Sequence, residues 1–252
     1  MKKVLFINCI TLFFLLLPVQ SQKSETLGNN LIDSKTLLLV EQNNNSDIIQ
    51  DLEEELEELK KDVVKEEPRK EKNLMIVAHP DDETIWGGGH LLADDYYVVC
   101  ITCDNVWYRD EEFKKVMKET NDEYVFLGYP DLTRGYIDDW SSSYEDIKED
   151  LNGIINSRDW NTIVTHNPEG EYGHIHHQMT NQIVTELANK DKLYYFGRYY
   201  TIDNMPEMPS ISEELYNQKM DKLISIYVSQ PLAMRRHHHM MPYENFVTYQ
   251  EW

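Results

Sequence analysis

Residues 73–83 read NLMIVAHPDDE, and this stretch decides the fold. Its apolar part, from Leu74 to Ala78, is uninterrupted, which is typical of a strand buried on both faces of a parallel sheet. The proline that follows bends the chain. An imidazole and two carboxylates stand at the bend, as His79, Asp81 and Asp82. The stretch therefore predicts a buried strand that carries metal-competent side chains at its carboxyl end.

Short apolar runs alternate with amphipathic segments after this stretch. We expect helices over 84–93, 110–121, 144–157, 177–189 and 213–227, and strands over 96–102, 124–127 and 162–166, with one or two more within 193–202. Alternation of this kind indicates parallel strands joined by helical crossovers. We therefore expect an α/β, Rossmann-like, doubly wound fold with a mainly parallel sheet over residues 73–252.

A second polar loop follows the strand expected at 162–166. It reads THNPEGEYGHIHH over residues 165–177. In open α/β sheets, ligands bind beyond the carboxyl ends of the strands, so we expect this loop to meet the first one. Imidazole nitrogens and carboxylate oxygens suit Zn²⁺ or another divalent ion, and a spare carboxylate can act as general base. The two loops together predict metal-dependent hydrolysis of an amide.

The two motifs resemble those of the LmbE/PIG-L-type N-acetylglucosaminyl de-N-acetylases. Three shorter motifs extend the resemblance: Arg109-x-x-Glu112, Leu127-Gly128-x-x-Asp131 and Tyr227-x-Ser229-Gln230. It covers residues 73–252 and implies a deacetylase of the LmbE-like fold. The implied reaction removes the acetyl group from an N-acetylglucosaminyl conjugate, a sugar or glycolipid such as N-acetylglucosaminylphosphatidylinositol.

The resemblance also implies a role for each matching residue. Zinc ligands would be His79, Asp82 and His177, and the general base would be Asp81. His174 would be the acid or oxyanion stabiliser and Tyr172 an auxiliary residue, while Arg109 and Asp131 would bind the sugar.

The chain departs from the family at His176, where an Asp is usual. We expect this second imidazole to lower the basicity of His174. It also leaves two candidates for the last metal ligand, of which the family register favours His177 over His176.

Two other functions stay open at this point. A hydrolase of the same fold could act on another N-acyl substrate, such as a mycothiol-like conjugate or an acylated antibiotic, because motifs determine a reaction class better than a substrate. A non-catalytic protein that binds a sugar or a metal is the third reading, prompted by His176.

The N-terminal part has three segments. Residues 1–22 carry two lysines before an apolar run and resemble a secretory signal peptide, with a signal anchor as the alternative. We expect a secreted or exoplasmic protein, or else one anchored in the endoplasmic reticulum membrane. Residues 23–47 form a polar spacer. Residues 48–72 predict an acidic helix whose short heptad seam over 49–63 is either a solvated face, which we favour, or a weak homo-oligomer contact.

Composition excludes one class of partner. The 252 residues hold 45 acidic and 24 basic side chains, for a net charge of −21. Such a surface repels phosphate backbones, so we expect no nucleic-acid partner.

Several chemically active residues have a simpler structural reading. Cys100 and Cys103 form a CxxC, but residues three apart on a strand face opposite sides, so we expect buried thiols and not a metal or disulfide pair. His237, His238 and His239 predict a solvated stretch that binds cations adventitiously. We expect no role for His90. Three tryptophans suit either the mouth of the site or the core: Trp86, Trp107 and Trp140.

Overall fold

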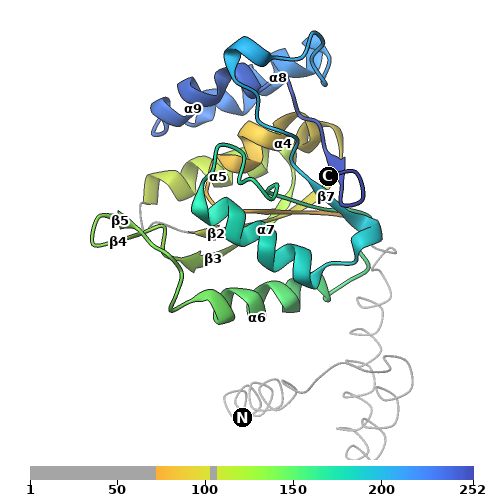
Figure 1. The fold of residues 1–252 in the computed structure, drawn as a ribbon. Coiled ribbons are helices and arrows are strands. Elements are labelled where there is room, and N and C mark those ends of the chain that lie inside the picture. The colour runs from red at the N-terminus through yellow and green to blue at the C-terminus, as the bar shows by residue number, and fades with distance from the viewer. Residues whose placement is uncertain (1–71, 103–106) are drawn as a thin grey trace, which may run out of the picture. The chain divides into compact units, whose positions relative to one another are not determined.

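The computed structural model describes residues 72–102 and 107–252 (Figure 1). The expected signal segment, spacer and acidic helix within residues 1–71 lie outside the described residues, as does Cys103. Among the helices of the described ranges, none is long and apolar enough to cross a bilayer.

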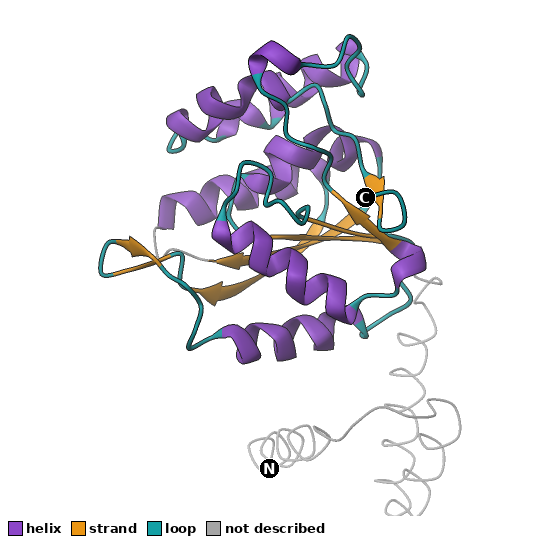
Figure 2. Ribbon diagram, in the orientation of Figure 1, coloured by secondary structure: helices purple, strands orange, loops and turns teal. Residues whose placement is uncertain are grey.

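A six-stranded sheet forms the centre of the domain (Figure 2). Its strands are β1 (Asn73–Val77), β2 (Tyr96–Thr102), β3 (Glu123–Tyr129), β6 (Ile163–Thr165), β7 (Leu193–Tyr195) and β8 (Val247–Thr248). The order is β3-β2-β1-β6-β7-β8, and only β8 runs antiparallel to its neighbour. The expected doubly wound, mainly parallel sheet is confirmed. A separate hairpin of β4 (Leu132–Thr133) and β5 (Tyr136–Ile137), and the edge strand β8, were not predicted.

Helices cover both faces of the sheet. They are α4 (Asp82–Ala93), α5 (Trp107–Thr120), α6 (Tyr144–Ile155), α7 (Ile175–Leu187), α8 (Glu213–Lys222) and α9 (Pro231–His237). Four 3-10 turns complete the elements: Lys190–Lys192, Ile202–Asn204, Ile224–Ile226 and His238–Met240. Helices α6 and α7 lie on one face, α4 and α5 on the other, and α8 and α9 lie beyond α4 (Figure 1). The helix expected over 213–227 ends at Lys222, and the run 193–202 contributes the single strand β7.

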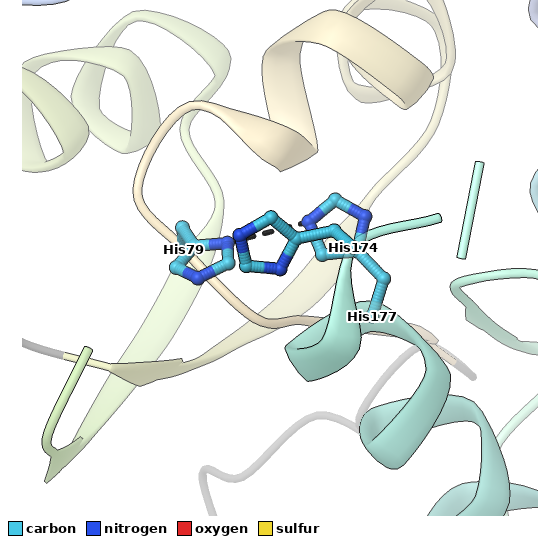
Figure 3. Close-up of side chains that lie close together, drawn as sticks. All are labelled: His79, His174 and His177. Carbon is cyan, nitrogen blue, oxygen red and sulfur yellow. Dashed lines mark hydrogen bonds between the residues drawn. The ribbon is translucent and has the colours of Figure 1, made fainter. Parts of the chain in front are cut away.

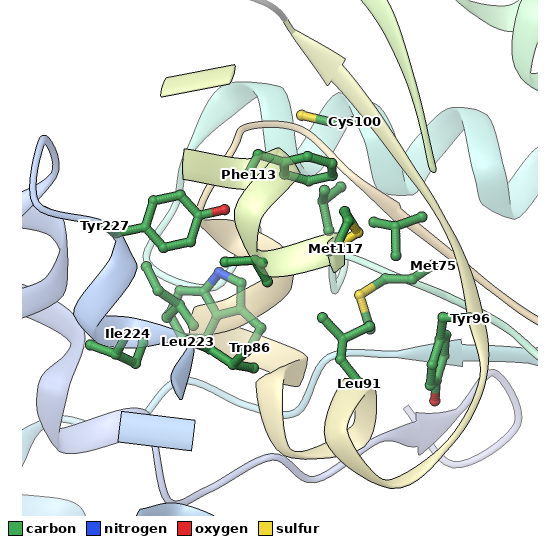
Figure 4. Close-up of a cluster of buried hydrophobic side chains, with 14 of the residues drawn as sticks. Met75, Trp86, Leu91, Tyr96, Cys100, Phe113, Met117, Leu223, Ile224 and Tyr227 are labelled. Atoms are coloured by element: carbon green, nitrogen blue, oxygen red, sulfur yellow. The ribbon is translucent and has the colours of Figure 1, made fainter. Parts of the chain in front are cut away.

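The alternation of side chains along β1 feeds two apolar cores. Leu74 and Ile76 belong to the core that α6 and α7 cover. Met75 and Val77 face the other way, into the core beneath α4 and α5 (Figure 4). Successive strand residues point to opposite faces, so a strand that is apolar throughout must be covered twice. Each such buried side chain contributes about 1.5–3 kcal/mol to folding.

The strand order reverses between β1 and β6. Helix α4 begins at Asp82, directly after β1, and α7 begins at Ile175, after the loop that follows β6. Crossovers leave these two strands in opposite directions, and a crevice forms between their carboxyl ends. The two polar loops identified in the sequence meet at this crevice.

Candidate active site

The crevice holds a cavity of about 240 Å³. Its lining includes seven of the eight residues expected in the site: His79, Asp81, Asp82, Arg109, Asp131, Tyr172 and His174. The eighth, His177, is fully buried beside them. Ile85, Gln230, Ala233 and His237 complete the lining.

Three donor atoms converge at the base of this cavity. Nδ1 of His79 lies 3.1 Å from Oδ2 of Asp82, and Nε2 of His177 lies 3.3 Å from each of them. Figure 3 shows the imidazole of His79, from the loop after β1, and that of His177, from the first turn of α7, reaching toward each other with His174 beside them. Ligands held about 2.0–2.1 Å from a tetrahedral ion stand about 3.3–3.4 Å apart. The triangle of donors therefore fits a divalent cation such as zinc, with the side toward the cavity open.

Hydrogen bonds direct the free nitrogen of His177 into this triangle. Its Nδ1 lies 2.5 Å from Oε2 of Glu171. The same carboxylate oxygen accepts from Nδ1 of His166, and the other accepts from the backbone N–H of Asn167. Because Nδ1–H of His177 donates to this carboxylate, Nε2 of a neutral His177 presents a lone pair, as a metal ligand must.

The charges of the cluster favour a cation. Burial opposes protonation of His79, but hydrogen bonds to Asp131 and Asp82 outweigh it and raise the pKa of His79. Burial likewise opposes ionisation of Asp82, yet the charges of His177 and His166 hold its pKa well below the usual range. The cluster thus stabilises positive charge between its donor atoms, and metal binding would release protons there.

Asp81 stands at the same cavity with a strained backbone. It has φ 121° and ψ −28°, a conformation that side chains rarely adopt, and it precedes the first turn of α4. Its backbone N–H donates to Oε2 of Glu83. Within the described ranges, its carboxylate has no hydrogen-bond donor. Burial and the charge of Asp82 raise the pKa of Asp81 well above its usual value.

His174 and Tyr172 line the opposite wall. Nδ1 of His174 accepts from the backbone N–H of His176, which caps α7, so the neutral ring carries its proton on Nε2. Burial, and then the charges of His79 and His177, lower the pKa of His174 to about 3. Burial and the charges of Asp82 and Asp81 raise the pKa of Tyr172 well above its usual range. Both groups are therefore neutral donors.

Comparisons with known proteins show which family the chain resembles. Residues 74–188 match the family model described as PIG-L: GlcNAc-PI de-N-acetylase. Through these residues, the chain is similar to the PIG-L/LmbE-like de-N-acetylase family.

A curated relative of the PIG-L-like chain comes from Acanthamoeba polyphaga mimivirus and is described as uncharacterized protein L374. It is 26% identical over 119 residues, which are 46% of this chain and 50% of the relative. The chain thus matches about half the length of this relative.

Solved structures share the fold at low identity. The A40926 pseudoaglycone deacetylase Dbv21 aligns with a TM-score of 0.50 at 16% identity, over 66% of this chain and 85% of its own. The 4-carboxy-2-hydroxymuconate hydratase GalB of Pseudomonas putida KT2440 aligns with a TM-score of 0.49 at 14% identity, over 67% of this chain and 84% of its own. The N,N'-diacetylchitobiose deacetylase of Pyrococcus horikoshii aligns with a TM-score of 0.49 at 18% identity, over 77% of this chain and 91% of its own. The likeness to Dbv21 shows the fold alone.

The short motifs of the PIG-L-like chain join the C-terminal segment to the site. Glu112 on α5 accepts from the N–H and the hydroxyl of Ser229, at 2.9 and 2.5 Å. The hydroxyl of Tyr227 donates to Glu83, at 2.5 Å. Arg109 donates to Gln230, whose amide oxygen faces the guanidinium.

Arg109 also binds Asp131, with Nη1 3.2 Å from Oδ2. The other oxygen of Asp131 lies 3.5 Å from Nε2 of His79. Burial opposes ionisation of Asp131, but these two neighbours hold its pKa below the usual range. Asp131 therefore contacts the expected metal ligand as well as lining the cavity.

The expected effect of His176 on His174 has the predicted direction, because the charge of His176 lowers the pKa of His174. The ring of His176 lies near both His79 and His174, with centroids 5.2 and 5.3 Å apart, and its Nδ1 is 3.0 Å from Nε2 of His79. Its effect on the pKa of His174 is smaller than those of burial, His79 and His177.

The expectation of a solvated 237–239 stretch is wrong for His237. That ring is only 3% exposed, lines the cavity and stacks on Tyr172 with ring centroids 4.5 Å apart. Periodicity gave no sign of this, because the two residues lie far apart in the sequence. Glu171, which contacts His177, and its other partner His166 lie inside the quoted 165–177 stretch. Their positions in this motif could therefore have identified them as candidate site residues.

The tryptophans, Cys100 and His90 that the sequence singled out lie in different environments. Trp86 and Trp140 are buried in the core, whereas Trp107 is exposed. Cys100 is a buried free thiol, as expected. His90 stacks on Phe246 and contacts the backbone carbonyl of Glu244, which is a structural role.

Proposed function

We propose that this protein is a zinc-dependent hydrolase that removes the acetyl group from an N-acetylglucosaminyl conjugate. One observation carries the proposal: three donor atoms with the spacing of a tetrahedral cation stand beside a carboxylate, Asp81, that has no hydrogen-bond donor among the described residues. The match of residues 74–188 to a de-N-acetylase family supports the reaction class.

The proposed cation ligands are His79, Asp82 and His177. A divalent ion bound there would polarise the amide carbonyl and lower the pKa of a nearby water molecule. Two nitrogens and one carboxylate oxygen form a ligand set that suits zinc.

The side chains around this centre supply the proton transfers. Asp81 accepts a proton from the water whose oxygen attacks the carbonyl carbon. His174, through its Nε2–H, and the hydroxyl of Tyr172 donate hydrogen bonds to the carbonyl oxygen as negative charge develops on it. When the C–N bond breaks, Asp81 returns the proton to the leaving nitrogen, which gives acetate and a free amine.

Release of acetate and amine by the full chain, with and without Zn²⁺, tests this function. Asp81→Asn should lower the rate by about 10²–10⁴-fold, because it removes the base. Zinc content measured by mass spectrometry should stay at the wild-type level. An unchanged rate in Asp81→Asn would refute the proposed mechanism.

Exposed apolar side chains that lie close in sequence to cavity-lining residues favour a conjugate with an apolar aglycone. Trp107, Tyr136, Val228 and Leu232 are 73–79% exposed, and each lies within five residues of a cavity-lining residue. Removing such side chains from water favours an amphiphilic substrate by about 25 cal/mol per Å².

An alkyl glycoside of N-acetylglucosamine should therefore be a better substrate than the free sugar. Trp107→Ser combined with Leu232→Ser should raise KM for the alkyl glycoside and leave KM for the free sugar unchanged. Equal KM values for both substrates in the wild type would contradict an apolar aglycone.

Export through residues 1–22 and the absence of a nucleic-acid partner at a net charge of −21 complete the proposal, with weak self-association through residues 49–63 as the less favoured alternative to a solvated face. Fractionation of the tagged full-length chain tests export, and recovery in the cytosol would contradict it. Sedimentation of the full chain tests self-association.

A further inference from the structure

We propose that His176 is a positioning residue for His79: it holds the imidazole of His79 in the one tautomer whose inner nitrogen is free to bind a cation. The inference rests on the proposed function only in requiring a cation at His79, Asp82 and His177.

The outer end of His176 determines which of its nitrogens carries the proton. Its Nε2 lies 2.6 Å from the backbone carbonyl oxygen of Asp138. A carbonyl oxygen can only accept, so the proton of the neutral imidazole is on Nε2. Nδ1 of His176 is consequently an acceptor.

This acceptor and the carboxylate of Asp131, whose Oδ1 lies 3.5 Å from Nε2 of His79, determine the tautomer of His79. Nδ1 of His176 lies 3.0 Å from Nε2 of His79, and the hydrogen between them must come from His79. A neutral His79 with its proton on Nε2 has a bare Nδ1. That Nδ1 is the atom 3.1 Å from Asp82 and 3.3 Å from His177. The chain of hydrogen bonds thus leads from the carbonyl of Asp138 to the cation site.

The loop of residues 130–140 fixes the ring of His176 and also contains the carbonyl that this ring contacts. The ring of Trp140 stacks on that of His176, with centroids 4.2 Å apart and planes 2° apart. Trp140 is itself fixed, because its Nε1 donates to the carbonyl of Pro130 and its backbone N–H donates to the Asp138 side chain. Trp140 and His176 are both fully buried.

An imidazole at position 176 can place an acceptor where an aspartate would also place one. Nδ1 of histidine and Oδ1 of aspartate are both bonded to Cγ, so each places an acceptor at the same distance from the backbone. The imidazole reaches farther through Nε2, and the Asp138 carbonyl receives that extension.

A second cation between His79, His176 and Asp131 is a competing reading. Their facing atoms are 3.0, 3.5 and 3.7 Å apart. That reading needs both nitrogens of His79 bare, and it places a cation on the carboxylate that already pairs with Arg109 at 3.2 Å. The hydrogen bond from His79 to His176 requires neither a fully deprotonated His79 nor a cation on Asp131, so the geometry favours the hydrogen bond.

A matched pair of variants in the full chain tests the inference. His176→Leu removes the acceptor at the Nδ1 position, whereas His176→Asn keeps a neutral acceptor there. Both lose the bond to Asp138 and the stacked imidazole. Zn²⁺ affinity, measured by competition with a chromophoric chelator, should fall about 10–100-fold in His176→Leu and stay within about 3-fold of wild type in His176→Asn.

Thr180→Val is the structural control. Thr180 is fully buried one turn further along α7 and donates to the backbone carbonyl of His176. Its loss should lower thermal stability without changing Zn²⁺ affinity.

Nitrogen-15 chemical shifts of the Zn²⁺-loaded wild type need no variant and should show His79 and His176 both protonated on Nε2. Several outcomes would overturn the inference: His79 protonated on Nδ1, wild-type affinity in His176→Leu, equal losses in both variants, or two ions bound per chain. Absence of any Zn²⁺ binding by the wild type would instead refute the proposed function.

Discussion

At the scale of single residues, Asp81 combines a buried carboxylate with a left-handed backbone. Its φ of 121° costs about 1–3 kcal/mol for a residue with a Cβ, and the turn from β1 into α4 imposes it. The strained backbone places the carboxylate of Asp81 beside the donor triangle. The fold therefore loses some stability in order to position this side chain.

Asp81→Gly should unfold at a higher temperature than Asp81→Ala. Both remove the carboxylate, but only glycine adopts this φ without strain, which should make it more stable by about 1 kcal/mol. For a domain of this size that is about 2–4 °C in Tm. Calorimetry of both variants measures it, and an alanine variant as stable as the glycine variant would contradict the strain.

The raised pKa of Asp122 predicts how the stability of the fold depends on pH. Burial raises its pKa to about 6, although its Oδ1 accepts from the N–H of Tyr96 at 2.7 Å. The folded state then binds this proton more tightly than the unfolded chain. The group's contribution to stability is therefore full below about pH 4 and is lost as the pH rises through 6.

Asp122→Asn keeps an acceptor for Tyr96 but cannot ionise. Relative to wild type, its free energy of unfolding should increase by about 2 kcal/mol between pH 4 and pH 8, since one pKa unit corresponds to 1.36 kcal/mol. Urea titrations at both pH values measure this difference. The same difference at both pH values would show that Asp122 does not titrate in this range.

At the scale of elements, one buried ion pair joins α4 to α8 and the C-terminal segment. Nζ of Lys219 lies 2.6 Å from Glu244 and donates to the carbonyls of Ile85 and Met241. Glu244 accepts from the backbone N–H groups of Gly89 and His90. The two side chains are fully buried, and Gly89 has no Cβ to obstruct the carboxylate.

Lys219→Met should lower the free energy of unfolding by about 3–5 kcal/mol, because it leaves the Glu244 charge buried without a partner. Adding Glu244→Gln should recover part of the loss, since the amide oxygen still accepts from Gly89. Denaturant unfolding of wild type, single and double variants measures both effects. A double variant less stable than Lys219→Met would show that the unpaired charge is not the cause.

The elements that sequence could predict are those with a whole buried face. The run from Leu74 to Ala78, and the helices with a clear apolar stripe, were located to within a few residues. The hairpin β4–β5, the edge strand β8 and α9 are too short for a periodic signal. In the site, the two motif loops were predictable because each is contiguous. The contact of His237 with Tyr172 was not, because it depends on how α9 is placed.

At the scale of the whole molecule, a cation bound between the two loops would link the first and second halves of the sheet. Zn²⁺ at about 100 times its Kd should stabilise the folded chain by about 2.7 kcal/mol. That corresponds to a rise in Tm of about 5–10 °C, which a chelator should reverse. His79→Ala should abolish the shift. Identical melting curves with and without Zn²⁺ in wild type would argue against a structural link.

The wall formed by Gln230, Ala233 and His237 has a consequence for how selectivity could diversify. All three follow residue 188, where the match to the de-N-acetylase family ends, whereas every proposed cation ligand precedes it. The proposed cation ligands and this part of the cavity wall are therefore encoded in separate stretches of the gene. Exchanging the last helices between relatives could retarget such an enzyme to a new acyl sugar while its chemistry stays intact.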